Sequence, residues 1–219
     1  MPTVDFFNQL HKKTTRDYAA RMQDDKVHCM RVAGEYDRDY WDGPRRYGYG
    51  GYHYDGRWAG IAQALIKKYS LGPQSKILDI GCGKAHLLLE LQKLLPTAQL
   101  TGIDISAYAL DNAPDAIRSC LQRHDAREPL PWTDQAFDLV VSLNCLHNFN
   151  FTPMTQAVRE IERVGISKYI LVESYRNEQE LFNLQCWALT ARSFYSTEDW
   201  FALYNLCHYT GDCEFIFFE

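Results

Sequence analysis

The chain has 219 residues, of which 46% are apolar and 23% charged. This balance is typical of one compact globular domain with a short appendage, and it excludes fibrous or wholly disordered classes. A formal net charge of −5 disfavours the broad basic face that a nucleic-acid partner requires. No apolar run approaches the roughly 18 residues of a membrane span, and residues 1–10 do not resemble a secretion signal. We therefore expect a cytoplasmic protein without a membrane partner.

The first quarter of the chain differs from the rest. Residues 4–22 show a weakly amphipathic pattern that predicts a helix. Residues 40–57 are rich in glycine and tyrosine, which excludes a regular helix there. We expect residues 1–57 to form an N-terminal helical and aromatic lid, which closes over a site in the remaining domain, residues 58–219.

Beyond this segment, short β-branched or apolar runs alternate with stretches of helical periodicity. Such alternation predicts a doubly wound α/β fold with a mostly parallel sheet of six or seven strands. The expected strands cover residues 76–80, 99–105, 121–124, 137–143, 168–173 and 214–218. The expected helices cover residues 58–69, 87–95, 154–161, 177–190 and 197–207.

Several helix ends carry recognisable signals. Thr152 followed by Pro153 predicts an N-cap with proline in the first turn, and Gly165 predicts the stop of the same helix. Ser196 and Asp199 have the spacing of a capping box, which predicts the start of the last helix.

The strand at residues 76–80 runs into the glycine turn Asp79-Ile80-Gly81-Cys82-Gly83, which opens a helix. Glycines let a backbone approach a ligand closely, and a helix start offers unpaired N–H groups. Asp104 follows Gly83 by 21 positions, at the end of the second strand, where a carboxylate can accept both hydroxyls of a ribose. These features predict a nucleoside site.

Two residues discriminate between the cofactors that use this arrangement. A dinucleotide site has a small residue at the sixth position of the glycine motif, but His86 stands there. Asp79 would repel a pyrophosphate and would suit a cationic ligand such as a sulfonium nucleoside with an amino group. The turn therefore disfavours nicotinamide dinucleotides.

This stretch resembles the first motif of the class I methyltransferases that use S-adenosylmethionine (SAM), and the resemblance extends over residues 58–219. It implies a Rossmann-like domain with SAM as the cofactor. Ala85 departs from the family pattern, since many members have a third glycine there. The implied cofactor contacts are Asp79, Gly81, Cys82, Gly83, Asp104, Ile105, Asp125, Ala126 and Asn144. Asp104 would hold the ribose, and Asp125 with Ala126 would flank the adenine.

The C-terminal end is short for this family. Its sheet usually ends in a two-stranded hairpin after the last helix, and only residues 208–219 remain here. We expect either a shortened hairpin that turns at residues 210–212 or the absence of the final strand.

Methyl transfer from a sulfonium is an in-line displacement, so the protein has to orient a nucleophile, exclude water and, where needed, remove a proton. The acceptor pocket should lie beyond the carboxyl ends of the strands. Candidates for substrate contact are His53, Tyr54, Arg57, His147, Asn148, Tyr175 and Arg176. The candidate bases are His147 and Glu173.

Each candidate also has a structural interpretation. His147 follows a buried strand and could be a hydrogen-bonded structural histidine, whereas Glu173 at a strand end is more often substrate-facing, since burying an unpaired carboxylate is costly. His53 and Tyr54 could simply cover the cofactor. Arg57 and Arg176 could clamp an anionic group of the acceptor, or one arginine could hold the carboxylate of the cofactor.

We therefore expect SAM-dependent methylation of a small, polar and anionic metabolite, with oxygen favoured as the methylated atom. The alternatives are N-methylation of a small amine, a nucleotide-linked oxidoreductase on the same sheet, and a catalytically silent binding subunit. Seven scattered cysteines without a C-x-x-C pair do not indicate a zinc site, and oxygen ligands for magnesium are too few near Asn144. No metal is expected, and the sequence does not indicate the oligomeric state.

Overall fold

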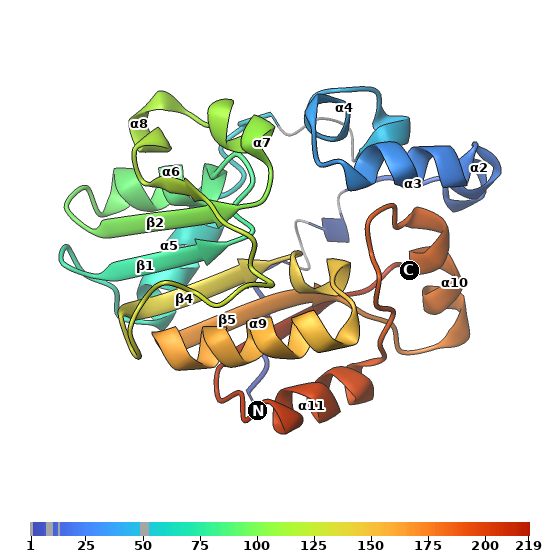
Figure 1. Cartoon of the computed structure of the whole chain (residues 1–219). Helices are drawn as coiled ribbons and strands as arrows, with labels where there is room; N and C mark the ends of the chain where they lie inside the picture. The colour runs from blue at the N-terminus through green and yellow to red at the C-terminus, as the bar shows by residue number, and fades with distance from the viewer. Residues whose placement is uncertain (1, 8–10, 13, 49–52) are drawn as a thin grey trace.

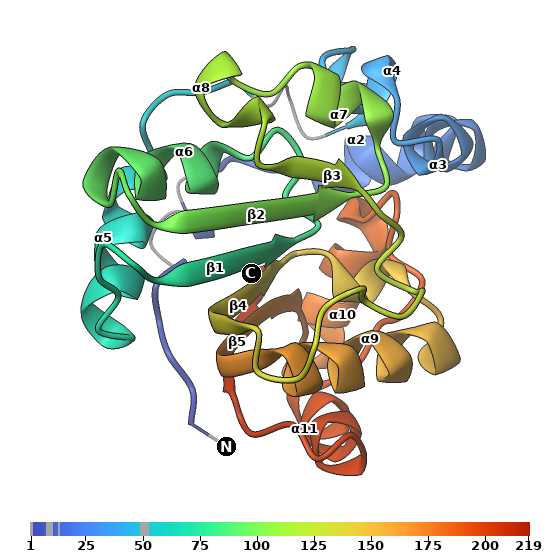
Figure 2. The ribbon, with the colours of Figure 1, turned by 60° about the vertical axis from the view of Figure 1, so that its left-hand side comes forward.

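A computed structural model describes residues 2–7, 11, 12, 14–48 and 53–219. Its centre is a single parallel sheet of six strands in the order β3-β2-β1-β4-β5-β6 (Figures 1 and 2). The strands are β1 (Lys76–Ile80), β2 (Gln99–Asp104), β3 (Leu121–Arg123), β4 (Phe137–Leu143), β5 (Gly165–Glu173) and β6 (Asp212–Ile216). The predicted doubly wound sheet is confirmed.

Helices cover both faces of this sheet because each carries one apolar stripe. On one face lie α5 (Ala59–Lys68), α6 (His86–Leu94) and α8 (Asp115–Arg118), whose leucines and isoleucines form one core with α10 (Glu178–Trp187). On the other face, α9 (Phe151–Val164) and α11 (Thr197–Leu206) build a second core. The short helix α7 (Ala107–Asp111) follows β2.

The helix-end signals are confirmed in part. The capping box of Ser196 and Asp199 is present at the start of α11. Asn150, rather than Thr152, is the N-cap of α9, so the helix begins before the proline and Pro153 lies within its first turn. The same helix ends at Val164 as expected, but Gly165 has an extended backbone and directly begins β5.

Strand order reverses between β1 and β4, because β1 pairs with β2 on one side and with β4 on the other. At such a switch point the loops after the two strands diverge, and ligands bind in the crevice beyond the carboxyl ends. The loop after β1 is the glycine turn, and the loop after β4 contains the 3-10 helix η2 (Leu146–Asn148). The fold thus places the predicted motifs together.

The N-terminal segment does not form the long helix expected over residues 4–22. Its described part contains α2 (Tyr18–Gln23), while residues near the start run beside β6, where Val4 N–H donates to the Cys213 carbonyl. The Glu214 carboxylate accepts the N–H groups of Phe6 and Phe7 at 2.9 and 2.7 Å. These backbone groups cover an edge strand that would otherwise be open, and this contact outweighs the weak helical pattern.

After α2 the chain forms α3 (Lys26–Gly34), α4 (Arg38–Trp41) and the 3-10 helix η1 (Arg45–Tyr47). These helices lie together at one end of the molecule, with α2 close to α10 (Figure 1). Part of the glycine and tyrosine run, residues 49–52, falls outside the described residues.

At the other end of the chain, β6 pairs with β5 in parallel, and the structure contains no hairpin after α11 among the described residues. Of the two expected outcomes, the absence of the final strand is therefore the correct one. The extended N-terminal residues lie along β6, and Thr3 forms an isolated parallel bridge with Cys213.

Candidate functional site

The glycine turn after β1 takes backbone conformations that explain its sequence. Gly81 and Gly83 have φ angles of 78° and 54°, in the left-handed region that side chains disfavour. A Cβ on Gly81 would lie 2.6 Å from Cys145, and one on Gly83 would lie 2.6 Å from the Trp41 ring. Ala85, which replaces the family's third glycine, also has a positive φ of 56° as the N-cap of α6. The turn therefore keeps a left-handed backbone at this position.

Asp79 is the last charged residue before this turn, and it is only 3% exposed. Burial, together with the nearby Asp104 carboxylate, raises the pKa of Asp79 to about 7. Among the described residues no cation forms an ion pair with it, although it lines the cavity in front of the turn. A buried carboxylate without a partner is costly, so this position favours a cationic ligand.

Asp104 closes the same turn from the end of β2. Its carboxylate accepts the N–H groups of Gly83 and Ser106, both at 2.8 Å. One bond to each oxygen leaves further lone pairs, so the carboxylate could still accept two hydroxyl groups. Burial raises the pKa of Asp104, and the backbone N–H groups of Ser106, Gly83 and Ile105 oppose that shift.

Two cavities meet at the carboxyl end of the sheet. The first, about 340 Å³, lies in front of the glycine turn, and the second, about 400 Å³, lies beyond β2 and β3. The residues that line both cavities, and so mark their junction, are Tyr40, Trp41, Gly81, Asn144, Asn148 and Thr190. A ligand with two unlike halves could therefore occupy both cavities through this junction.

The second cavity contains Asp104 and other residues expected to contact the cofactor. Ile105, Asp125 and Ala126 all line it. The Asp125 carboxylate is paired with Arg127, 2.6 Å from its guanidinium. The cavity thus combines the Asp104 carboxylate with the apolar side chains of Ile105 and Ala126.

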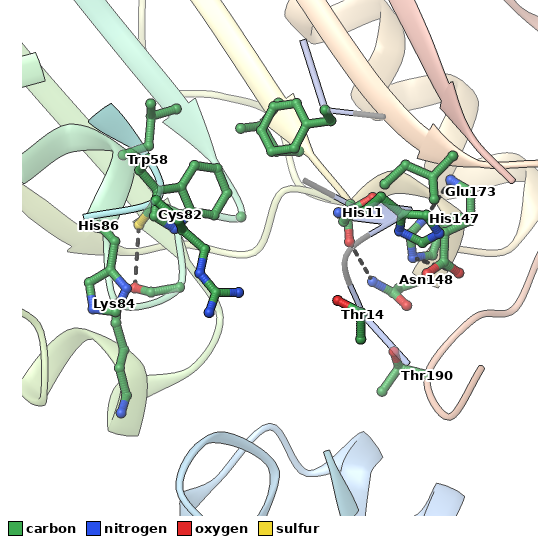
Figure 3. Close-up of a pocket in the computed structure, with 18 of the residues that line it drawn as sticks. His11, Thr14, Trp58, Cys82, Lys84, His86, His147, Asn148, Glu173 and Thr190 are labelled. Carbon is green, nitrogen blue, oxygen red and sulfur yellow. Dashed lines mark hydrogen bonds and ion pairs between the residues drawn. The ribbon is translucent and has the colours of Figure 1, made fainter. Parts of the chain in front are cut away.

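The first cavity contains a histidine and a glutamate in contact. His147 Nε2 lies 3.6 Å from Glu173 Oε2, and the Glu173 N–H donates to His147 Nδ1 at 3.3 Å. Burial lowers the pKa of His147, and the Glu173 carboxylate opposes that shift. Figure 3 shows this pair, with Asn148, across the cavity from Cys82, Lys84 and His86.

The N-terminal helices pack onto the glycine turn. The ring of Trp41, at the end of α4, lies against Gly83, and its Nε1–H donates to Ser106 Oγ at 2.9 Å. Lys84, which is 9% exposed, forms an ion pair with Asp42. These contacts place α4 over the position where a ligand of the turn would lie.

Not every predicted substrate residue lines a cavity. His53 and Arg57 line the first one, as do His147 and Asn148. Tyr54 instead contacts Glu90 and Lys93 on α6, and Tyr175 forms a bridge with Ser196. These two tyrosines line neither cavity.

Arg57 and Arg176, the two arginines predicted to clamp an anionic group, are both paired with carboxylates in the structure. Arg176 pairs with Glu180 and Glu219 and lines neither cavity. Arg57 is paired with Asp55 at the rim of the first cavity. An acceptor role for Arg176 has no support in this geometry, because two carboxylates already hold its guanidinium.

Arg16 and Trp41 are among the residues of the first cavity that the sequence did not point to. The Arg16 guanidinium donates to the carbonyls of His11 and Thr14, and it lies 5.2 Å from the centroid of the Phe218 ring. Its burial lowers the pKa of Arg16. Both residues come from the segment before the parallel sheet and carry no motif, so only the fold of that segment shows their position.

The comparisons with known proteins agree with this geometry. The protein-family model described as "Methyltransferase domain" matches residues 77–165. This match confirms the resemblance of residues 77–165 to the methyltransferases.

Similar curated proteins have different activities. A mitochondrial arginine-hydroxylase, NDUFAF5 from Danio rerio, is 31% identical over 111 residues, which are 50% of this chain and 33% of that protein. A trans-aconitate 2-methyltransferase from Enterobacter sp. (strain 638) is 34% identical over 80 residues, which are 36% of this chain and 31% of that protein. The chain spans about a third of the length of these relatives.

Solved structures show the same fold. YcgJ from Bacillus subtilis superposes with a TM-score of 0.54 at 21% identity, over 67% of this chain and 66% of that one. The 4+2 cyclase SpnF superposes with a TM-score of 0.53 at 19% identity, over 94% of this chain and 72% of that one. Within the described part of this chain, no helix is long and apolar enough to cross a membrane.

Proposed function

We propose that this chain transfers the methyl group of SAM to a small polar acceptor that carries negative charge, with oxygen as the favoured atom. The match of residues 77–165 to a model described as "Methyltransferase domain" supports this proposal. The observation that carries the proposal is the buried Asp79 carboxylate in the first of two adjacent cavities. A cationic ligand compensates this charge, and a nucleoside fits the cavity beside it.

The residues of the two cavities would bind different parts of the cofactor. Asp104 would accept the ribose hydroxyls, while Ile105, Asp125 and Ala126 would surround the adenine in the second cavity. The cationic methionine half would lie in the first cavity beside Asp79. There its other proposed contacts are Gly81, Cys82, Gly83 and Asn144. SAM bound in this way supplies an electrophilic methyl group on a sulfonium.

The strand order alone does not separate this proposal from a nucleotide-linked oxidoreductase, because dinucleotide-binding sheets have the same order. The turn does separate them. A pyrophosphate would bring negative charge next to the buried Asp79 and Asp104 carboxylates, a repulsion that a low-dielectric site strengthens. His86 also replaces the small residue of the dinucleotide motif at the start of α6.

The rest of the first cavity suits an acceptor. Its wall contains Arg16, whose guanidinium donates to two carbonyls and to His11 rather than to a carboxylate. An anionic group on the acceptor would complement this charge, with His53 and Arg57 at the rim. His147 or Glu173 would take a proton from the acceptor, if the reaction requires it.

We further propose that residues 1–57 act as a lid over this site. The contacts of Trp41 with Gly83 and of Lys84 with Asp42 support this role, because both bring the N-terminal segment onto the glycine turn. Trp41→Ala should raise the dissociation rate of SAM at least about tenfold, by loss of a buried aromatic contact. An unchanged rate in a folded variant would refute the lid.

Mass spectrometry of reaction products tests the activity. The protein is incubated with SAM and a panel of small hydroxy acids, phosphorylated metabolites and amines, and the products are weighed. Methyl transfer adds the mass of one CH₂ group and consumes SAM in equal amount. Because one similar protein is named a hydroxylase, the informative contrary result is the gain of one oxygen atom without SAM consumption. A product methylated on nitrogen would keep the enzyme class and overturn the choice of oxygen.

A further inference from the structure

We propose that Glu173 is the general base of the reaction and that His147 is a positioning residue held in the neutral Nε2–H form. The methylated group is therefore a proton-bearing hydroxyl rather than a carboxylate. This inference rests on the proposed function and chooses between the two candidate bases. The observation behind it is that Glu173 contacts both ring nitrogens of His147, one through its backbone N–H and the other through its carboxylate.

The backbone of Glu173 decides the tautomer of His147. The Glu173 N–H donates to Nδ1 at 3.3 Å, so Nδ1 must offer its lone pair and cannot carry a proton. In a neutral imidazole the proton then resides on Nε2. The Nε2 atom lies 3.6 Å from Oε2 of the same glutamate. A small side-chain movement would therefore let the Nε2–H group donate to the carboxylate.

His147 is fixed in this position by its surroundings. Its carbonyl accepts the N–H groups of Arg192 and Ser193 at 2.9 and 3.1 Å, and its side chain is buried. A second proton on the ring would place an Nδ1–H against the Glu173 N–H, and burial already lowers the pKa of His147. The ring therefore has no free lone pair with which to accept a proton from a substrate.

Glu173 lies at the end of β5, where its carbonyl accepts the Trp200 indole N–H at 3.1 Å. Its Oε2 atom is buried and has no hydrogen-bond donor among the described residues, and the same holds for Asn148 Oδ1. Two acceptors in one cavity wall call for a ligand that brings hydrogen-bond donors. A carboxylate at this position would bring only acceptors and a like charge.

Arg16, on the N-terminal segment, is a charged group that interacts electrostatically with Glu173. It lines the same cavity. The negative charge of the acceptor therefore belongs at the Arg16 end, while its hydroxyl points to Glu173. A hydroxy acid has both groups.

The step balances with residues of this chain and SAM alone. The hydroxyl oxygen attacks the methyl carbon in line with the C–S bond. The C–O bond forms, the C–S bond breaks, and its electron pair stays on sulfur as a neutral thioether. The hydroxyl proton passes to the Glu173 carboxylate, and solvent takes it up after product release.

Nitrogen NMR tests the tautomer without any turnover. In protein labelled with ¹⁵N-histidine, the signals of His147 are assigned by their absence in His147→Gln. We expect the neutral Nε2–H pattern at neutral and higher pH, with and without the demethylated cofactor. An imidazolium pattern in that range, or a proton on Nδ1, would overturn the proposal whether or not the chain methylates anything.

Kinetics tests the roles. Glu173→Gln should lower kcat at least ~100-fold, the usual contribution of a general base, and should remove the acidic limb of the pH profile. His147→Gln keeps an N–H donor, so its kcat should fall less than ~10-fold with the acidic limb retained. Glu198→Gln, the same change at an exposed position of α11, is the matched control. A larger fall in kcat for His147→Gln than for Glu173→Gln would overturn the assignment.

Substrate analogues test the reacting group. Hydroxy acids from the panel should be methylated on the hydroxyl, and their deoxy analogues should not react. Formation of a methyl ester from a deoxy acid would refute the choice of hydroxyl. Calorimetry of SAM binding to each variant and to the wild type distinguishes this failure from a failure of the proposed function. If the wild type does not bind SAM, the proposed function is wrong.

Discussion

Asp79→Asn should make the free protein more stable and the cofactor complex weaker. In the absence of a ligand, the Asp79 carboxyl is buried without an ion-pair partner among the described residues, and its pKa is raised to about 7. The folded chain thus holds this proton more tightly than the unfolded chain does. Stability from this group is therefore present at low pH and is lost as the pH rises from roughly 4 to 7.

The size of the effect follows from the pKa. An unfolded aspartate has a pKa of about 3.9, so the rise to about 7 destabilises the free fold by at most ~4 kcal/mol above neutral pH, at ~1.4 kcal/mol per unit. The substituted amide carries no charge and avoids this penalty. For a chain of this length the melting temperature rises by ~2–4 °C for each kcal/mol gained.

SAM binding should show the opposite effect. The cation binds the ionised carboxylate, so wild-type affinity should increase with pH up to about 7, by as much as tenfold per unit. Asp79→Asn should remove this dependence and weaken SAM binding at pH ~8 by ~10–150-fold, the value of a charged hydrogen bond. Thermal unfolding and calorimetry across this pH range measure both quantities.

The matched control is Asp111→Asn, the same change at an exposed position at the end of α7. It should alter neither the melting temperature nor the affinity measurably. If Asp79→Asn left SAM affinity intact at pH ~8, or lowered the stability of the free protein, the interpretation of Asp79 as an uncompensated charge would be refuted.

Other variants should separate the parts of the site. Asp104→Asn should lower SAM affinity at least ~10-fold in titrations, because its carboxylate oxygens bind the turn and would bind the ribose; an unchanged affinity would contradict that role. Gly83→Ala should lower the free energy of unfolding by ~1–3 kcal/mol in denaturant titrations, since its Cβ would clash with Trp41, and a neutral effect would show that α4 does not pack there. Arg16→Ala should raise the acceptor KM ~10-fold or more with SAM affinity unchanged, whereas Arg176→Ala should change neither; equal effects of the two variants would contradict the proposed anion site.

The sequence was most informative where the chemistry is local. The glycine turn, Asp79 and Asp104 were predicted together because a strand, a turn and a second strand end form one continuous pattern. The structure places Asp79 in the first cavity and Asp104 in the second, with Gly81 lining both.

The N-terminal segment could not be predicted in the same way. Phe6 and Phe7 fit a helical period, yet their N–H groups bond the Glu214 carboxylate, a residue more than 200 positions away. The resulting path brings Arg16 into the first cavity, whereas Arg176 is held by Glu180 four residues on. Long-range pairing decided the path of this segment, and a pattern within one segment contains no information about it.

A competition titration with SAM and NAD⁺ on the unmodified protein at pH ~8 tests the central claim most directly. With the Asp79 carboxylate ionised, SAM and its demethylated product should each bind one site per chain, and excess NAD⁺ should displace neither. Binding of NAD⁺ with no heat from SAM would show that the turn holds a pyrophosphate, and the account would be wrong.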